Sequence, residues 1–158
     1  MKLFAFAASL RAASINKKLV ALAADLARGA GAEVTVADFA EICPPLYNAD
    51  VQRDSGFPPE AERLKQLLEE HDGFLLASPE YNYSFPGTLK NAIDWVSRYR
   101  PVPTRGKCAY LLSAAPGAVG GNRGLWHLRQ PLSCIGVRVY PGMFSLANAT
   151  DAYAEDGA

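Results

Sequence analysis

Four polar side chains fall between an apolar run at residues 3–8 and a segment of helical spacing that begins near residue 15. They are Ser9, Arg11, Ser14 and Asn16. The first turn of a helix carries free backbone N–H groups and a partial positive charge, and both favour an anion. Arg11 adds a guanidinium that can bind two oxygens at once. The group suits a terminal phosphate, although Ser14 as a simple helix cap and Arg11 as a solvated side chain remain an alternative.

A second cluster lies at residues 79–87, where three aromatic side chains stand among prolines after another apolar run. The residues that could border a ligand are Pro79, Glu80, Tyr81 and Asn82. Aromatic rings at a strand end can pack on a planar ligand, while backbone N–H groups bind its polar edge. The alternative is a rigid turn whose rings pack on a neighbouring helix. Because nothing near Glu80 suggests a partner for acid–base chemistry, we expect it to cap or support the loop.

Small side chains predominate in a third segment, residues 113–121. Ser113 and Gly117 would let the backbone approach a flat ligand closely. A glycine-rich segment is also typical of an ordinary turn, so it indicates a ligand site only in combination with the other two clusters.

The absence of several motifs disfavours other common kinds of ligand site. The first cluster has neither the G-x-G-x-x-G of a dinucleotide site nor the G-x-x-x-x-G-K-[ST] of a nucleoside triphosphate site. It also holds no cysteine that could attack a phosphoester. His71 and His127 have no cysteine or carboxylate at metal-ligand spacing, so we interpret both as structural or surface residues. We therefore predict a binding site with no metal and no catalytic side chain.

Short apolar runs alternate with amphipathic segments along the chain, and this alternation predicts the elements that position the three clusters. Strands are expected at residues 2–8, 33–38, 73–78, 107–113 and 138–144. Helices are expected at residues 15–28, 59–71, 86–99 and 121–135, with a long loop at 39–58. In the first helix, Leu19, Leu22, Ala23 and Leu26 have the spacing of one apolar face.

The repetition of strand, helix and strand predicts a parallel sheet with helices on both faces. Five strands in 158 residues fit the flavodoxin-like α/β fold, a three-layer sandwich with strand order 2-1-3-4-5. In that order the first, third and fourth strands are neighbours, so the three clusters line one crevice at their carboxyl ends. Ligands of open α/β sheets bind at such a crevice.

Length and composition limit the partners. The 158 residues fit one domain, and 16 Lys and Arg balance 16 Asp and Glu, which disfavours nucleic acid as a partner. No apolar run approaches the ~18 residues that span a bilayer. The three cysteines show no paired spacing, which indicates a reducing cytoplasm. After the fifth strand no covering helix follows, so we expect residues 1–158 to lack a final helix and one face of the edge strand to be bare.

Four segments resemble the NAD(P)H-dependent FMN reductase family, within the flavodoxin-like superfamily. They are Ser-Leu-Arg-x-x-Ser-x-Asn at 9–16, Cys-Pro-Pro-Leu-Tyr-Asn-Ala-Asp at 43–50, Ser-Pro-Glu-Tyr-Asn-Tyr-Ser-Phe-Pro-Gly-x-Leu-Lys-Asn-Ala-Ile-Asp-Trp at 78–95, and Ser-x-x-Pro-Gly-x-x-Gly-Gly at 113–121. They occur in family order and cover nearly the whole chain. Two features depart from the family: Ala8 stands where glycine is frequent, and the last helix is absent after residues 154–157.

The resemblance implies an FMN site built from all three clusters. Ser9, Arg11, Ser14 and Asn16, with the amide of Ile15, would hold the phosphate. Pro79, Glu80, Tyr81 and Asn82 would border the isoalloxazine, and Ser113 and Gly117 would close its other side.

The implied activity is an NAD(P)H-dependent FMN oxidoreductase. NADPH or NADH would give a hydride to bound FMN, and a quinone, azo compound, metal oxyanion or free flavin would then take the electrons in a ping-pong cycle. Members of the family are typically homodimers or homotetramers. One alternative is a flavodoxin-type one-electron carrier, which the neutral net charge disfavours. Another is a flavin-free interaction protein on the same scaffold.

Overall fold

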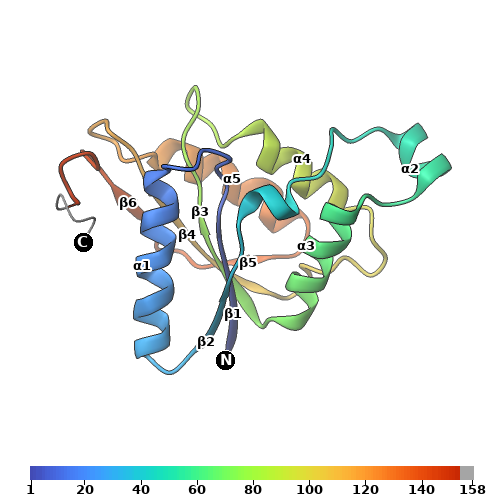
Figure 1. The fold of residues 1–158 in the computed structure, drawn as a ribbon, viewed down its shortest axis with the longest axis horizontal. Helices are drawn as coiled ribbons and strands as arrows, with labels where there is room; N and C mark the ends of the chain where they lie inside the picture. The colour runs from blue at the N-terminus through green and yellow to red at the C-terminus, as the bar shows by residue number, and fades with distance from the viewer. Residues whose placement is uncertain (154–158) are drawn as a thin grey trace.

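A parallel sheet forms the middle layer of the molecule (Figure 1). The computed structural model describes residues 1–153. The strand order is β2-β1-β3-β4-β5, with β6 also paired to β4, and every pairing is parallel. The strands are β1 Lys2–Ala7, β2 Glu33–Val36, β3 Gly73–Ala77, β4 Cys108–Ala114, β5 Arg138–Val139 and β6 Phe144–Leu146. The order 2-1-3-4-5 and the flavodoxin-like fold are therefore confirmed.

The fifth strand is not continuous, as residues 138–144 were expected to be. Val139 pairs with Ala109, and Phe144 pairs with Leu112, so the edge strand uses more residues than β4 over the same distance. The N–H groups of Arg138 and Tyr140 donate to the carbonyls of Lys107 and Ala109, and Pro141 follows at the point where this alternation ends. Two short strands, β5 and β6, together fill the fifth position of the sheet.

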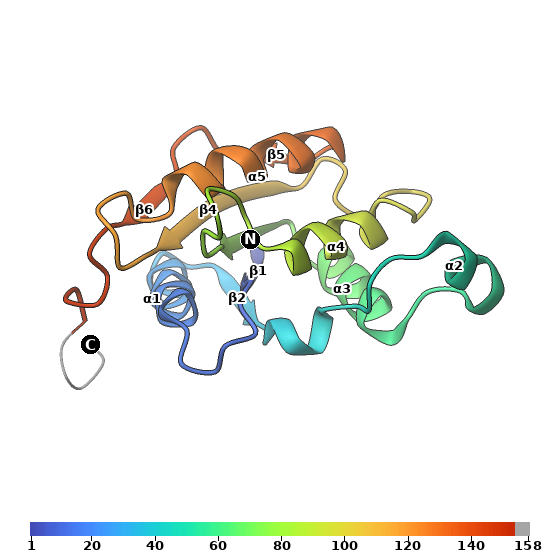
Figure 2. The same ribbon diagram turned by 90° about the horizontal axis from the view of Figure 1, so that it is seen from above.

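Helices cover both faces of the sheet, but unequally. Figure 2 shows α1 on one side and α3, α4 and α5 on the other. Their bounds are α1 Ile15–Gly29, α3 Pro59–Glu70, α4 Gly87–Val96 and α5 Asn122–Cys134. Side chains of β1 alternate accordingly: Phe4 and Phe6 point into the core under α3 and α4, whereas Ala5 and Ala7 pack against α1.

The expected loop at 39–58 contains two short helices, so that expectation was wrong in part. A 3-10 helix, η1, spans Phe39–Ile42, and α2 spans Ala49–Ser55. The side chains of Asp38 and Asn48 cap them by accepting from the N–H groups two residues ahead. No residue of α2 is buried, which explains why hydrophobic periodicity gave no sign of it.

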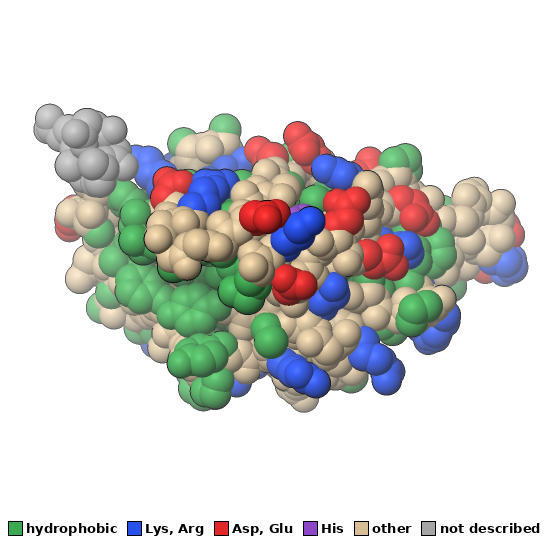
Figure 3. Space-filling model, turned by 90° about the horizontal axis from the view of Figure 1, so that it is seen from below, with side chains coloured by type: hydrophobic (Ala, Val, Ile, Leu, Met, Phe, Trp, Pro, Cys, Tyr) green, Lys and Arg blue, Asp and Glu red, His purple; other side chains and the backbone are tan. Residues whose placement is uncertain are grey.

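One flank of α1 remains uncovered. Leu22 and Leu26 have the spacing of the buried face but are 52% and 67% exposed. They line a groove of about 310 Å³ beside the sheet, together with Leu75, Tyr110, Leu112 and Phe144. The underside of the molecule accordingly carries a broad hydrophobic area on the side of α1 (Figure 3). Residues 147–153 form turns and bends, and 154–158 lie outside the described residues, so no described element covers this groove.

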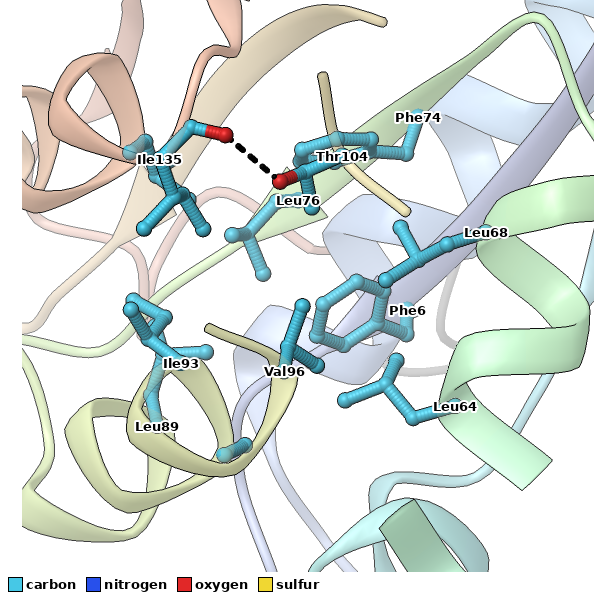
Figure 4. Close-up of a pocket in the computed structure, with 12 residues that line it drawn as sticks. Phe6, Leu64, Leu68, Phe74, Leu76, Leu89, Ile93, Val96, Thr104 and Ile135 are labelled. Carbon is cyan, nitrogen blue, oxygen red and sulfur yellow. Dashed lines mark hydrogen bonds between the residues drawn. The ribbon is translucent and has the colours of Figure 1, made fainter. Parts of the chain in front are cut away.

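The opposite face contains a small internal cavity of about 30 Å³ (Figure 4). Core side chains from β1, β3, α3 and α4 point into it, including Phe6, Leu64 and Ile93. Thr104 contributes a hydroxyl, but it donates to the Ile135 carbonyl at 2.9 Å. A space of this size holds about one water molecule at most, so it is a packing defect rather than a ligand site.

Candidate functional site

The three clusters of unusual residues lie at one edge of the sheet. Ala7 of β1 pairs with Ala77 of β3, which pairs in turn with Leu112 of β4, so the segments that follow these strands are neighbours. We call residues 9–16, 78–87 and 113–124 together the carboxyl-edge site. Side-chain hydrogen bonds join the first part to the third and the second part to the third. The convergence expected from the strand order is therefore present.

The first part of the site presents positive charge and unpaired donors. Arg11 is exposed, and Lys18 lies in the first turn of α1, which contains no acidic residue, whereas Lys17 in the same turn is paired with Asp38 at 2.7 Å. Within residues 1–153, the N–H groups of Ala12 and Ala13 donate no hydrogen bond to protein. Cations at a helix N-terminus are unfavourable by themselves, so this arrangement favours an anion.

Two buried serines shape the turn before α1. The Ser14 hydroxyl caps α1 by accepting from the Asn16 N–H at 3.2 Å, as the capping alternative anticipated. The Ser9 hydroxyl accepts from the Arg11 N–H at 3.4 Å. Ile15 is half-buried at the first position of α1. These contacts fix the course of the backbone and leave the Arg11 guanidinium in solvent.

Asn16 points into the molecule rather than toward solvent. Its side chain is 2% exposed and forms two hydrogen bonds to Ala114 at the end of β4, each 2.9 Å long. The side-chain amide thus pairs with a strand end much as another peptide group would. One N–H and the oxygen of its amide bind Ala114, so Asn16 connects the first part of the site to the third.

A tight hairpin forms the second part. Tyr81 and Ser84 exchange backbone hydrogen bonds of 2.7 and 3.0 Å, and Asn82 and Tyr83 between them have φ of 50° and 68°. Positive φ at both central residues is the signature of a type I′ turn. Asn tolerates this conformation, whereas it strains a Tyr backbone. Tyr81, Asn82 and Tyr83 are exposed, while Pro79 is buried at the base of the hairpin.

The third part is shaped by close packing. Ser113 is fully buried, and its hydroxyl donates to the Ser78 carbonyl at 2.7 Å. A Cβ on Gly121, where φ is 82°, would lie 2.0 Å from that hydroxyl oxygen. Gly117 is exposed, and its carbonyl accepts from the N–H groups of Gly120 and Asn148. Ser113 therefore joins the second part to the third, and Gly117 remains at the surface.

Glu80 caps a neighbouring helix, in line with the capping or supporting role expected from the sequence. Its Oε2 accepts from the Gly124 N–H at 3.0 Å, and its Oε1 lies 3.7 Å from the Arg123 guanidinium. That guanidinium also lies over the Tyr83 ring, 4.2 Å from its centroid. Sequence reasoning missed Arg123 and Gly124. The available signal was a basic residue in the first turn of a helix that contains no acidic residue.

The segment at 43–50 is attached to α4. The Asn91 amide nitrogen donates to the carbonyls of Pro44 and Pro45, and its oxygen accepts from the Tyr47 N–H. The Trp95 indole donates to Pro45 at 2.8 Å. Two of the segments that carry the family resemblance, 43–50 and 78–95, are therefore joined by hydrogen bonds.

The described residues contain no group of three or more His, Cys, Asp or Glu that could hold a metal ion. His71 is buried, with ring nitrogens at hydrogen-bond distance from the Leu67 carbonyl and the Thr35 hydroxyl. Burial and the nearby Glu60 carboxylate raise the pKa of the Cys43 thiol, so it stays protonated near neutral pH. Among residues 1–153, no helix is both long and apolar enough to cross a bilayer.

Comparisons with known proteins agree on one family. The model of the NADPH-dependent FMN reductase family matches residues 1–151. A NAD(P)H-dependent FMN reductase from Pseudomonas aeruginosa is 43% identical over 132 residues, 84% of this chain and 69% of that protein. A quinone reductase from Escherichia coli is 49% identical over 88 residues, 56% of this chain. The match spans 47% of that reductase, about half its length.

A solved structure is similar across the whole sheet. The flavoenzyme NAD(P)H:(acceptor) oxidoreductase FerB from Paracoccus denitrificans superposes with a TM-score of 0.81 at 32% identity, covering 99% of this chain and 85% of that one. The family match runs through all three parts of the carboxyl-edge site. This chain belongs to the NADPH-dependent FMN reductase family.

Proposed function

We propose that the protein is an NAD(P)H-dependent FMN oxidoreductase that passes electrons to a small-molecule acceptor. The observation that carries the proposal is the first part of the site. An exposed guanidinium and unpaired N–H groups precede a helix whose first turn has no carboxylate. A phosphate would meet both the charge and the donors there.

The residues fit FMN in separate roles. Arg11, the hydroxyls of Ser9 and Ser14 and the Ile15 N–H would bind the phosphate. Asn16 would act indirectly, because its amide is engaged with Ala114 and holds the loop in place. This fit supports the phosphate assignment from the chemistry of the donors alone.

The other two parts of the site would hold the flavin ring. Tyr81 and Asn82 would border it largely through backbone groups, over the base formed by Pro79 and Glu80. Gly117 would lie on the opposite side, and Ser113 would support that side from the interior by its bond to Ser78. Glycines at 120 and 121 let this backbone pack closely against Leu146 and the Ser113 hydroxyl.

When bound, FMN supplies the hydride-accepting and electron-donating chemistry. The chain binds and orients it, and we assign no acid or base to a side chain. The acceptor class, whether quinone, azo compound, metal oxyanion or free flavin, belongs to the same proposal. So do a homodimer or homotetramer and a cytoplasmic location; the three free thiols Cys43, Cys108 and Cys134 support a reducing compartment.

An anaerobic titration tests the proposal. The protein is loaded with FMN, freed of excess flavin and mixed with NADPH or NADH while the visible flavin band is followed. We expect rapid bleaching directly to the two-electron-reduced form. Bound flavin that fails to bleach with either nucleotide contradicts a reductase and favours the one-electron carrier.

Arg11→Ala tests the phosphate assignment separately. We expect FMN to bind roughly 10- to 100-fold more weakly, since a hydrogen bond to a charged group contributes about 1.5–3 kcal/mol. Riboflavin, which lacks the phosphate, is the matched control ligand and should bind both proteins equally. Unchanged FMN affinity would remove Arg11 from the site.

A further inference from the structure

We infer that Glu80 is a positioning residue that clamps the 81–84 hairpin to the N-terminus of α5. The inference rests on the proposed function only where it concerns flavin. Its structural basis is that α5 has no cap of its own, and that the missing cap comes from a loop more than forty positions earlier in the chain.

Helix α5 cannot cap itself. Its N-cap position is Gly121, which has no side chain and adopts φ of 82°. Any larger residue there would collide with the buried Ser113 hydroxyl, 2.0 Å from an added Cβ. The first turn contains no acidic residue either. The free N–H groups and positive end of α5 therefore need an acceptor from elsewhere.

Glu80 supplies that acceptor at short range. Its carboxylate accepts from the Gly124 N–H at 3.0 Å, and the side chain is only 14% exposed. Gly124 allows the approach: an added Cβ would lie 3.2 Å from the Ser84 carbonyl oxygen and 3.4 Å from the Glu80 Cβ. The hairpin thus lies directly on the first turn of α5, with Glu80 at its base.

The clamp extends to the tip of the hairpin through Arg123. Oε1 of Glu80 is 3.7 Å from Arg123, whose guanidinium lies 4.2 Å from the centroid of the Tyr83 ring. Tyr83 has the strained φ of 68°, and a cation over its face helps to hold it there. Glu80 therefore acts on Tyr83 through Arg123, and it fixes the second part of the site relative to the third.

Hydrogen exchange of the flavin-free protein tests the clamp without any activity. In Glu80→Ala, the Gly124 amide should exchange roughly tenfold faster, the effect expected for losing a helix cap. Glu80→Gln keeps an acceptor oxygen but loses the charge, so exchange at Gly124 should rise less while the Tyr83 ring protons shift in the NMR spectrum. Glu41→Ala, which removes an exposed carboxylate in η1, is the matched control and should change neither signal.

The outcomes separate the clamp from the proposed function. Unchanged Gly124 exchange in Glu80→Ala overturns the clamp, and unchanged Tyr83 signals in Glu80→Gln overturn its extension through Arg123. If Glu80→Ala does not fold, Glu80→Leu, which keeps the bulk and has no acceptor, replaces it in the Gly124 measurement, while Glu80→Gln still decides the extension through Arg123. In FMN titrations, we expect weaker binding in Glu80→Ala than in Glu80→Gln. Equal affinity in Glu80→Ala and the unchanged protein overturns the positioning role, whereas an unchanged protein that binds no FMN contradicts only the proposed function.

Discussion

The first loop and the hairpin belong to the same site, but the chain holds them by opposite means. The turn before α1 is secured by buried side chains, namely the Ser14 cap and the Asn16 amide paired with Ala114. The hairpin has exposed side chains at Tyr81, Asn82 and Tyr83 and is secured by its backbone turn and by Glu80 at its base.

This difference matches two kinds of ligand surface. A phosphate has fixed oxygen positions, so a loop that binds it gains from a rigid backbone whose donors are already oriented. A flat ring can be bordered by exposed aromatic side chains on a turn. The first loop should therefore lose stability when its buried contacts are removed, whereas the hairpin tip should tolerate change or even gain stability.

We expect the largest effect on stability at Gly121, in the third part of the site, to which both other parts are hydrogen-bonded. Gly121→Ala places a methyl group against the Ser113 hydroxyl at positive φ, which should lower the free energy of unfolding by about 3 kcal/mol. Gly117→Ala is the matched control, because nothing lies within 4 Å of an added Cβ there. Urea unfolding measures both. Equal stability of the two variants would mean that the Ser113 side chain moves aside at little cost in free energy.

Asn16→Ala should have the next largest effect on stability. It tests whether the first loop depends on its buried contacts. It leaves the N–H and carbonyl of Ala114 buried without their partners, which should cost about 2 kcal/mol of stability in the flavin-free protein. Urea unfolding again provides the measurement. A loss seen only with FMN bound would instead make Asn16 a direct ligand.

Tyr83→Gly tests the hairpin in the opposite direction. It creates an Asn-Gly pair in a type I′ turn, the preferred dipeptide, and relieves the backbone at φ of 68°. We expect stability to rise by about 0.5–1 kcal/mol. A thermal melt of the flavin-free variant decides the sign. A lower melting temperature would show that the Arg123 contact outweighs the strain.

The smallest effect concerns Asp38, beside the first loop. Hydrogen bonds from the Lys17 side chain and the Ala40 N–H hold the pKa of Asp38 below its usual value. A lowered folded pKa contributes stability above the unfolded value of about 3.9, and this contribution is lost as pH falls further. Asp38→Asn should therefore melt slightly lower than the unchanged protein at pH 7, with the difference shrinking toward pH 3. A constant difference would contradict this assignment.

The sequence predicted which loops form the site better than it predicted the hydrogen bonds between them. Alternating apolar runs indicated the strand order, and that order alone brought the three clusters together. Hydrogen-bonding partners across the site were not accessible, because the partner of Asn16 is 98 positions away and that of Glu80 is 44. The family resemblance makes Asn16 a phosphate ligand, and its bonds to Ala114 are a further role that the sequence did not indicate.

Helical spacing also could not show which apolar side chains of α1 are buried. Leu22 and Leu26 have helical spacing with Leu19, but burial depends on whether a neighbouring element exists, and spacing carries no information about that. The interruption of the fifth strand shows a similar limit. Pro141 was visible in the sequence, yet nothing in its position indicated that pairing with β4 would resume only at Phe144.

The open groove beside α1 affects how the stability of this chain depends on its surroundings. Leu22 and Leu26 remain largely in water after folding, so they add little to the free energy of unfolding. An apolar element that binds the groove binds only the folded state, so mass action raises the free energy of unfolding by an amount that grows with the ratio of its concentration to its Kd. The melting temperature would rise with the concentration of such an element. If the element were another copy of the chain, the melting temperature would rise with the concentration of the protein itself.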